Sequence, residues 1–330
     1  MTRTAKVEQP SGQTDRRFRI LSMVTVAATF ALVVLGGVVR VTGSGLGCPD
    51  WPLCHGGVVP TAEPSTLIEY SHRLVASLVG LLVLAVAVVC WRSYRNNRWL
   101  WWPALAALAL VVAQGALGGL TVLSELGPNL VMAHLAMAEA LLATVVLVHL
   151  VAARGAPRSS IGTSSQGRRP GLTLLTLVTA LAAYGLLLSG SYTTVYGASA
   201  VCGSWPLCRG EWFPEGRLPL IHMAHRYAAL AVGILVAITI VVAWRVRPRT
   251  YLAWLWLAAG GLFLTQALVG AANVWLNFSE GVRALHLALG SGVWALLAAL
   301  VILPYMAARP SLRTAPRQAR QLATSEGPPS

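Results

Sequence analysis

Eight long apolar runs dominate this sequence, and each is long enough to cross a lipid bilayer as a helix. A span needs about 20 mostly apolar residues, and backbone groups in lipid must find their hydrogen-bond partners within the segment. Alternation of the barrel type is absent. The predicted fold is therefore an all-α integral membrane protein. The predicted spans are 20–39, 67–91, 100–123, 130–153, 171–192, 219–244, 251–275 and 282–305.

The composition excludes a soluble or disordered chain. Hydrophobic residues make up 56% of the sequence and charged residues only 11%, whereas soluble domains carry about 25% charged residues. The net charge is +14, but the basic residues form short clusters between apolar runs and no continuous basic face. We therefore expect membrane lipid around the protein and no nucleic-acid partner.

The distribution of Lys and Arg predicts the orientation. Of 25 such residues, 19 lie in the two tails and in loops 92–98, 154–170 and 245–249. The positive-inside rule places these segments in the cytoplasm, with both termini. The longer loops 40–66 and 193–218 then lie outside. The segment 154–170 is rich in Gly, Ser and Arg and is predicted to be a flexible linker.

The two halves of the chain are a tandem repeat. The first outer loop contains CPDWPLC from Cys48 to Cys54, and the second contains CGSWPLC from Cys202 to Cys208, at an offset of 154. Other equivalent pairs, at offsets of 153 or 152, are His72 and His225, Gln114 and Gln266, and His134 and His286. Duplication of a four-helix unit predicts two pseudo-symmetric four-helix bundles. The predicted segments are an N-terminal tail (1–19), a first bundle (20–153), the linker (154–170), a second bundle (171–305) and a C-terminal tail (306–330).

Four histidines occupy matched depths inside the predicted spans. His72, His134, His225 and His286 each lie about 6–9 Å below the outer start of a span, at 1.5 Å per residue. Two histidines at one depth on two helices of a bundle are what axial ligation of a haem requires. Zinc would need more ligands in each half. Non-haem iron, held by two histidines and a carboxylate, remains an alternative for the first half only.

The two halves differ beside the ligand candidates. Glu69 lies three residues before His72 on the same helix face, and its equivalent is His222. An acid inside a membrane is costly and therefore suggests function, although a water-exposed helix end would also explain it. Glu139 is the other acid well inside a span; it is equivalent to Ser291, and its role is left open. We expect His149 to be structural and His55 to be a loop residue.

Charged and sulfur-containing residues near the outer surface offer further candidates. Arg73 and Arg226 directly follow ligand candidates and are candidate contacts for anionic haem propionates. Arg40 and Arg283 are weaker candidates of this kind. The outer cysteines predict the disulfides Cys48–Cys54 and Cys202–Cys208 in an oxidising compartment; a redox-active or metal-binding dithiol is the alternative. Cys90 is predicted to be a packed thiol.

Together these residues resemble the haem A synthase family. The resemblance rests on the run GGVVRVTGSGL at 36–46, the Cys48 to Cys54 loop, Glu69 with His72 and Arg73, and the remaining histidines. It extends over nearly the whole chain apart from the tails and the linker. The resemblance implies a bacterial plasma-membrane enzyme that oxidises the C8 methyl of haem O to a formyl group, giving haem A for terminal oxidases.

The resemblance also implies roles for individual residues. His225 and His286 would ligate a haem b cofactor, His72 and His134 would ligate the substrate haem O, and Glu69 would be catalytic. Candidate partners are a haem O synthase (a farnesyltransferase) and an electron donor. Physical reasoning agrees, because a six-coordinate haem suits electron transfer and the half with the extra carboxylate is equipped to handle protons.

Two other functions would also use four matched histidines. A diheme electron-transfer cytochrome b explains the histidines but not the replacement of Glu69 by His222. A haem transporter or chaperone predicts an exchangeable site without a catalytic carboxylate. The haem recovered from membranes supplied with haem O would distinguish the enzyme from both.

Overall fold

The computed structural model describes residues 14–156, 170–246 and 248–306, and these contain eight helices long and apolar enough to span a membrane. The eight predicted spans are thereby confirmed. The predicted linker falls mainly on 157–169, and the two tails fall mainly on 1–13 and 307–330, outside the described residues. The helices are α1 (Arg16–Val41), α2 (Pro64–Ser93), α3 (Arg98–Leu123), α4 (Pro128–Arg154), α5 (Pro170–Val195), α6 (Arg217–Val246), α7 (Tyr251–Trp275) and α8 (Glu280–Ile302), followed by the short 3-10 helix η2 (Leu303–Tyr305).

Several helices begin a few residues before the predicted span. Hydropathy detects the apolar centre of a helix, whereas local backbone chemistry determines where the helix begins. The Asp15 side chain accepts a hydrogen bond from the Arg17 backbone N–H and caps α1. Proline occupies the first turn of α2 and of α4, where its missing N–H has no helical partner to lose. These helices therefore extend beyond the apolar runs of the sequence.

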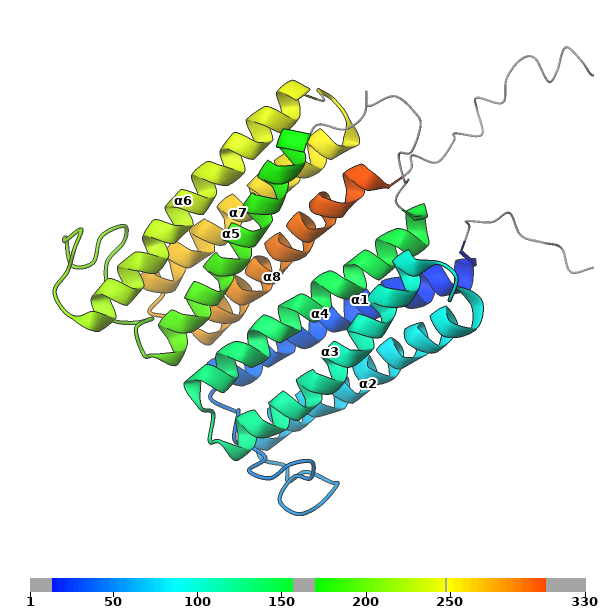
Figure 1. Cartoon of the computed structure of the whole chain (residues 1–330). Coiled ribbons are helices and arrows are strands. Elements are labelled where there is room, and N and C mark those ends of the chain that lie inside the picture. Colours follow the sequence, from blue (N-terminus) through cyan, green and yellow to red (C-terminus); the bar gives the residue numbers. More distant parts are fainter. Residues whose placement is uncertain (1–13, 157–169, 247, 307–330) are drawn as a thin grey trace, which may run out of the picture.

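The helices form two four-helix bundles side by side (Figure 1). Within the first bundle the neighbouring pairs are α1–α2, α2–α3, α3–α4 and α4–α1. Within the second they are α5–α6, α6–α7, α7–α8 and α8–α5. Consequently α2 lies diagonally opposite α4, and α6 lies diagonally opposite α8. Each bundle has the same arrangement, as expected for a duplicated unit.

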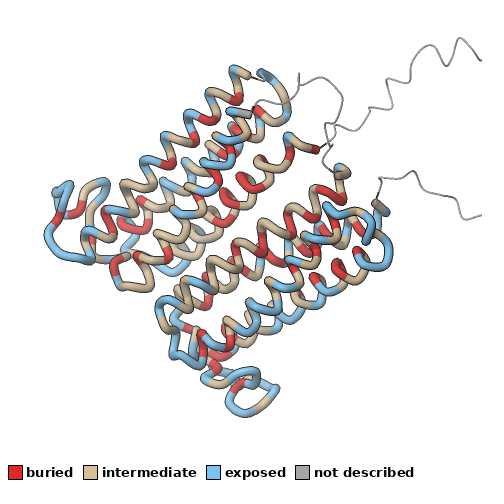
Figure 2. The backbone as a smooth tube through the Cα atoms, in the orientation of Figure 1, coloured by how far each residue is buried: buried red, intermediate tan, exposed pale blue. Residues whose placement is uncertain are grey.

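The two bundles contact each other through α1 and α4 on one side and α5 and α8 on the other. A Cβ added to Gly37 of α1 would lie 2.3 Å from a terminal methyl carbon of Leu287 of α8, so that side chain would have to move. Tyr184 of α5 donates a hydrogen bond to the Ala136 carbonyl of α4. Figure 2 shows buried segments along this contact and exposed segments on the outer surfaces, as expected for helices that face lipid.

Both outer loops fold in the same way. Disulfides join Cys48 to Cys54 and Cys202 to Cys208, as predicted. The Asp50 carboxylate accepts hydrogen bonds from the backbone N–H groups of Gly56 and His55, and these bonds lower the pKa of Asp50. At the equivalent place in the second loop, the Ser204 hydroxyl accepts a bond from the Arg209 N–H. His55 is a loop residue, as predicted.

Candidate functional site

The structure brings the four histidines together in two pairs. His72 of α2 and His134 of α4 come from diagonally opposite helices of the first bundle and lie within electrostatic range of each other. His225 of α6 and His286 of α8 do the same in the second bundle. The first member of each pair lies eight residues into its helix and the second lies six, which is about 12 Å and about 9 Å along the helix axis. These depths slightly exceed the predicted ones because α2, α4, α6 and α8 all begin two or three residues before the predicted spans.

Three of the four imidazoles have a buried ring nitrogen without a partner among the described residues. The Nδ1 atoms of His72, His134 and His286 are buried and have no hydrogen-bond partner among the described residues. Buried polar groups in proteins are nearly always satisfied, so such atoms call for a ligand or solvent. Two facing imidazoles in an apolar four-helix bundle fit a haem whose iron both could ligate.

Each of the four imidazoles packs against a glycine of the preceding helix. A Cβ added to Gly36 would lie 3.1 Å from the Cε1 atom of His72, and one added to Gly118 would lie 3.1 Å from that of His134. The corresponding distances are 3.1 Å for Gly190 and His225, and 3.0 Å for Gly270 and His286. Ordinary carbon contacts begin at about 3.5 Å. A side chain at any of these positions would therefore push the imidazole.

Sequence reasoning missed these glycines, although the signal was present. Gly36 and Gly190 differ by the offset of 154 that relates the outer loops. Gly118 and Gly270 differ by the offset of 152 that relates His134 and His286. Glycines that recur at the repeat offset, each facing a recurring histidine, mark positions where the helix backbone approaches the ring.

The hydrogen bonds around the imidazoles differ between the bundles. In the second bundle the Ser189 hydroxyl lies 2.7 Å from Nδ1 of His225, and the Gln266 amide nitrogen lies 3.5 Å from Nε2 of His286. In the first bundle Gln114 instead donates to the backbone carbonyl of His134. His72 has no hydrogen bond from its ring to any described residue. The second bundle therefore holds its ligand candidates more firmly.

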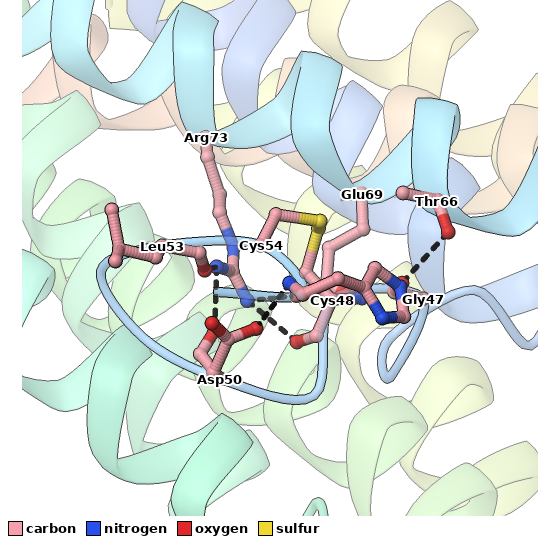
Figure 3. Close-up of polar contacts among 9 residues, drawn as sticks. Gly47, Cys48, Asp50, Leu53, Cys54, Thr66, Glu69 and Arg73 are labelled. Atoms are coloured by element: carbon pink, nitrogen blue, oxygen red, sulfur yellow. Dashed lines mark hydrogen bonds and ion pairs between the residues drawn. A yellow bond between two sulfur atoms is a disulfide. The ribbon is translucent and has the colours of Figure 1, made fainter. Parts of the chain in front are cut away.

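Glu69 is buried and connects α2 to the first outer loop (Figure 3). Its Oε2 accepts a hydrogen bond of 2.8 Å from the Cys48 N–H, and its Oε1 pairs with Arg73 Nη2 at 2.6 Å. Glu69 is only 4% exposed, so the alternative of a water-exposed helix end is wrong. Thr66, one turn earlier, donates to the Gly47 carbonyl of the same loop. The carboxylate thus lies between the disulfide loop and the guanidinium group.

The two predicted propionate contacts that follow the ligand candidates hold the outer loops. Arg73 donates to the carbonyls of Cys48, Asp50 and Leu53 as well as to Glu69. Arg226 donates through Nη1 to three carbonyls of the second loop, those of Ser204, Pro206 and Leu207. The geometry gives both guanidinium groups a structural task that the sequence did not indicate. The buried Nη2 of Arg226 has no partner among the described residues, so it retains a free donor for an anion.

The other two arginines lie where the bundles meet. Arg40 of α1 donates to the Ser191 hydroxyl of α5 at 3.4 Å, and Arg283 of α8 donates to the Val41 carbonyl of α1 at 3.4 Å. Both contacts cross from one bundle to the other. Neither arginine forms an ion pair with a carboxylate of the described residues. Arg40 and Arg283 thus remain free to bind an anion at the end of the bundles that carries the disulfide loops.

His222 does not reproduce the contacts of Glu69. Its Nδ1 lies 2.9 Å from the Ala198 carbonyl, and the side chain is buried. Glu69 instead contacts the Cys48 N–H and Arg73. The second bundle therefore has no carboxylate beside its ligand candidates. The sequence predicted that Glu69 is replaced by His222 in the second half. In the structure this replacement changes both the side chain and its contacts.

The remaining candidates are assigned by their contacts. The Nδ1 of His149 lies 3.0 Å from the Ser22 hydroxyl and joins α4 to α1, which fits the structural role that we expected. Cys90 is a buried free thiol. Glu139 lies where the bundles meet, with Ser291 as its partner. Among the described residues, no three His, Cys, Asp or Glu side chains group closely enough to hold a metal ion, so Glu69 does not join His72 and His134 in a non-haem iron site.

Comparisons with known proteins extend this picture. A family model described as cytochrome oxidase assembly protein matches residues 19–220. A protein named "Heme A synthase" from Shewanella oneidensis is 30% identical, over 86% of this chain and 95% of its own length. One from Symbiobacterium thermophilum is 32% identical, over 87% of this chain and 95% of its own. One from Halalkalibacterium halodurans is 29% identical, over 87% of this chain and 97% of its own. The family model matches more than half of the chain, and the heme A synthases are similar to it along most of its length. The chain therefore belongs to the cytochrome oxidase assembly protein family.

Proposed function

We propose that this multi-pass membrane protein is a haem A synthase, which oxidises the C8 methyl of haem O to a formyl group. The observation that carries this proposal is the pair of histidines on diagonally opposite helices of each bundle, three of the four with a buried ring nitrogen that has no partner among the described residues, in a chain that belongs to this family. Two histidine pairs supply one site for a substrate haem and one for a cofactor haem. Conversion of methyl to formyl is a four-electron oxidation, most simply two hydroxylations followed by loss of water.

The first bundle is the proposed substrate half and the second the proposed cofactor half. His72 and His134 would ligate haem O, and His225 and His286 would ligate haem b. The Ser189 contact to Nδ1 of His225 supports this division, because a hydrogen bond to the second ring nitrogen fixes the orientation of a metal-bound imidazole. A resident cofactor benefits from fixed ligands. His72 lacks such a partner, which suits a ligand that must release product.

Glu69 is the proposed proton-handling residue of the substrate half. Bound haem b would supply one-electron transfer, and oxidation of a methyl group releases protons that a nearby base must accept. The carboxylate lies on the same helix as His72, one turn further outward, and the Arg73 guanidinium keeps it oriented. Burial excludes bulk water from this group. Such positioned acid–base groups contribute roughly 10²–10⁴-fold to rate.

The proposed setting is the bacterial plasma membrane with both termini in the cytoplasm. The disulfide loops then face the oxidising side, in keeping with their oxidised cysteines. Haem propionates would point outward, toward the free Nη2 of Arg226 and toward Arg40 and Arg283. A haem O synthase would deliver the substrate, and a separate donor would supply electrons.

The decisive experiment is to supply the purified protein in lipid nanodiscs with haem O, a reductant and oxygen, and to extract the haem. Chromatography and mass spectrometry should detect hydroxymethyl and formyl haem. Boiled protein is the control. Recovery of unchanged haem O alone, from protein that carries haem b, would favour an electron-transfer cytochrome. Binding and release of unchanged haem O without haem b would favour a haem transporter.

A further inference from the structure

Each outer loop carries a pair of exposed apolar residues a few positions before the next helix. We call these two pairs the loop tips. The first tip is Val58 and Val59, which are 72% and 80% exposed, and the second is Trp212 and Phe213, which are 62% and 79% exposed. The two pairs are equivalent at the offset of 154. Single exposed apolar side chains are common, but the recurrence of an exposed apolar pair at equivalent positions calls for a partner.

A tyrosine holds each tip against the neighbouring helix. The Tyr70 hydroxyl of α2 donates to the Val58 carbonyl at 2.6 Å. The Tyr227 hydroxyl of α6 donates to the Trp212 carbonyl, and its ring lies 5.9 Å from that of Phe213. The two tyrosines are not equivalent in the repeat, because Tyr227 corresponds to Leu74 at the offset of 153. Both halves thus make the same attachment from positions one helical turn apart.

Both tyrosines lie on helix faces that point to lipid. Residues three or four apart share one face of a helix. On α2 this face carries exposed leucines, and on α6 it carries exposed leucine and isoleucine. These are Leu67, Leu74, Leu78 and Leu81, with exposed fractions of 46%, 55%, 52% and 65%, and Leu220, Leu230, Ile234 and Ile238, with 45%, 65%, 53% and 48%. Each tip therefore lies beside the lipid-facing side of its bundle and not above the bundle axis. Figure 1 shows the two outer loops at opposite flanks of the molecule, beside the ends of α2 and α6.

The depth of the tyrosines places both in the outer half of the bilayer. Helices α2 and α6 each have 30 residues and are about 45 Å long. The hydrocarbon core is about 30 Å thick, which leaves about 7 Å of helix in each headgroup region. Tyr70 and Tyr227 lie about 9 Å and about 15 Å from the helix starts. Helical side chains lean toward the N-terminus, so the Tyr70 hydroxyl lies near the outer boundary and the Tyr227 hydroxyl lies below it, within the outer leaflet.

We propose that the two loop tips insert into the outer leaflet of the bilayer, at the level where headgroups meet acyl chains. The partner is phospholipid, because the tips continue an apolar surface that already faces lipid. Trp and Tyr are favoured at this level, where an apolar ring and a polar edge are both satisfied, and Phe is common among the apolar residues that segments at this level bury. Insertion fixes the disulfide loops against the membrane, and the first of these loops holds Glu69 and Arg73. This proposal does not depend on which haem occupies which bundle.

Spin labels in single-chain nanodiscs test the insertion. In a Cys90→Ser background, Phe213→Cys is labelled with a nitroxide, and its collision rates with oxygen and with a water-soluble nickel chelate are compared. Glu215→Cys, an exposed polar position two residues away, is the matched control. The label at 213 should collide preferentially with oxygen, and the label at 215 with nickel. Val59→Cys and Ala62→Cys repeat the comparison in the first loop and cover the case in which one variant does not fold.

The attachment is tested by Tyr227→Phe, which removes the hydroxyl and keeps the ring. The label at 213 should then become more mobile and more accessible to nickel, with both disulfides still formed. Equal nickel access at 213 and 215, and at 59 and 62, would overturn the proposal. The proposal would also be overturned if the label at 213 were protected from nickel in native membranes but not in nanodiscs that hold only this chain. That result would identify a protein partner in place of lipid.

Discussion

Glu139 and Ser291 occupy equivalent positions in the two halves of the chain, and they hydrogen-bond to each other. The Ser291 hydroxyl of α8 donates to Glu139 Oε1 of α4 at 2.5 Å, and both side chains are fully buried. A pseudo-twofold axis relates one bundle to the other. Two equivalent positions can touch only where this axis passes between them. Trp294 adds a bond of 2.9 Å from its indole N–H to the Glu139 carbonyl. This contact therefore marks the centre of the interface between the bundles.

Replacement of Ser291 by alanine should destabilise the protein. The substitution leaves the Glu139 carboxyl buried without its donor, which costs about 1–3 kcal/mol. Thermal unfolding in detergent, followed by circular dichroism, should show a lower midpoint than for the parent protein. Thr265→Ala removes an exposed hydroxyl that bonds only to its own helix and should change the midpoint little. Equal midpoints for the two variants would contradict a role for the Glu139–Ser291 bond.

Loss of either proposed ligand in the second bundle should remove haem b. His225→Ala or His286→Ala takes away one of the two imidazoles that would bind the iron. The pyridine haemochromogen assay should report reduced haem content, and the low-spin absorption spectrum should disappear. His149→Ala, which removes an imidazole bonded to Ser22, is the control and should retain both signals. A normal low-spin haem b spectrum in both ligand variants would refute the assignment.

Alanine at Gly190 or Gly270 should disturb the haem without removing a ligand. The added Cβ would lie about 3 Å from the facing imidazole, so the ring must move. We expect altered g values in electron paramagnetic resonance and lower haem occupancy. The controls are Gly185→Ala on the same helix as Gly190 and Gly261→Ala on the same helix as Gly270, because neither added Cβ meets any atom within 4 Å.

The controls should be neutral or slightly more stable, since alanine favours a helix over glycine by about 0.8–1.0 kcal/mol. Identical spectra for all four glycine variants would show that these glycines do not position the imidazoles. Equal loss of haem in controls and test variants would instead indicate a general defect of the helices.

Glu69→Gln should abolish haem A formation or stop it at the hydroxymethyl stage, while haem b on His225 and His286 is retained. Glutamine keeps the size of the side chain and an acceptor for the Cys48 N–H, but it has no charge and no basic oxygen. Extracted haems are compared by chromatography. Thr66→Val is the matched control, because it removes another hydrogen bond between α2 and the same loop. If both variants lose activity equally, Glu69 acts by holding the loop; normal haem A formation by Glu69→Gln would exclude a role in proton handling.

Both outer loops should carry internal disulfides in protein from native membranes. Digestion without reduction, followed by mass spectrometry, should recover peptides linked through Cys48 and Cys54 and through Cys202 and Cys208. Cys90 is buried and free and should react with a thiol reagent only after unfolding. Free thiols at all four loop positions would contradict the oxidised loops.

The sequence predicted the helices and the duplication well because both depend on signals along the chain. Hydropathy reports eight apolar spans directly, and the offsets between His72 and His225 and between His134 and His286 report the repeat. The matched depth of the histidines follows from counting residues along each helix. No knowledge of helix rotation or packing is needed for these conclusions.

The contacts of Glu69 and of the glycines could not be predicted in this way. Glu69 bonds to Cys48, 21 residues earlier, and only the folded loop brings that N–H to the helix. Gly36 and Gly118 meet imidazoles because α1 packs against α2 and α3 packs against α4 within the first bundle. Arg73 and Arg226 donate to carbonyls of the disulfide loops, and only the folded loops bring these carbonyls to the helices. These are tertiary relationships, and periodicity within one helix does not determine them.

The contact between Glu139 and Ser291 constrains the ancestry of the chain. If the four-helix unit first existed as a separate polypeptide that paired with itself, this position would have faced its own copy. Two glutamates would have met as like groups competing for one proton, and two serines would have lacked a carboxyl to bind. Within one chain the two positions need not be identical, so one half carries the acceptor and the other carries the donor. An asymmetric pair at the centre of a symmetric frame therefore favours contact between the two different halves over contact between two copies of the same half.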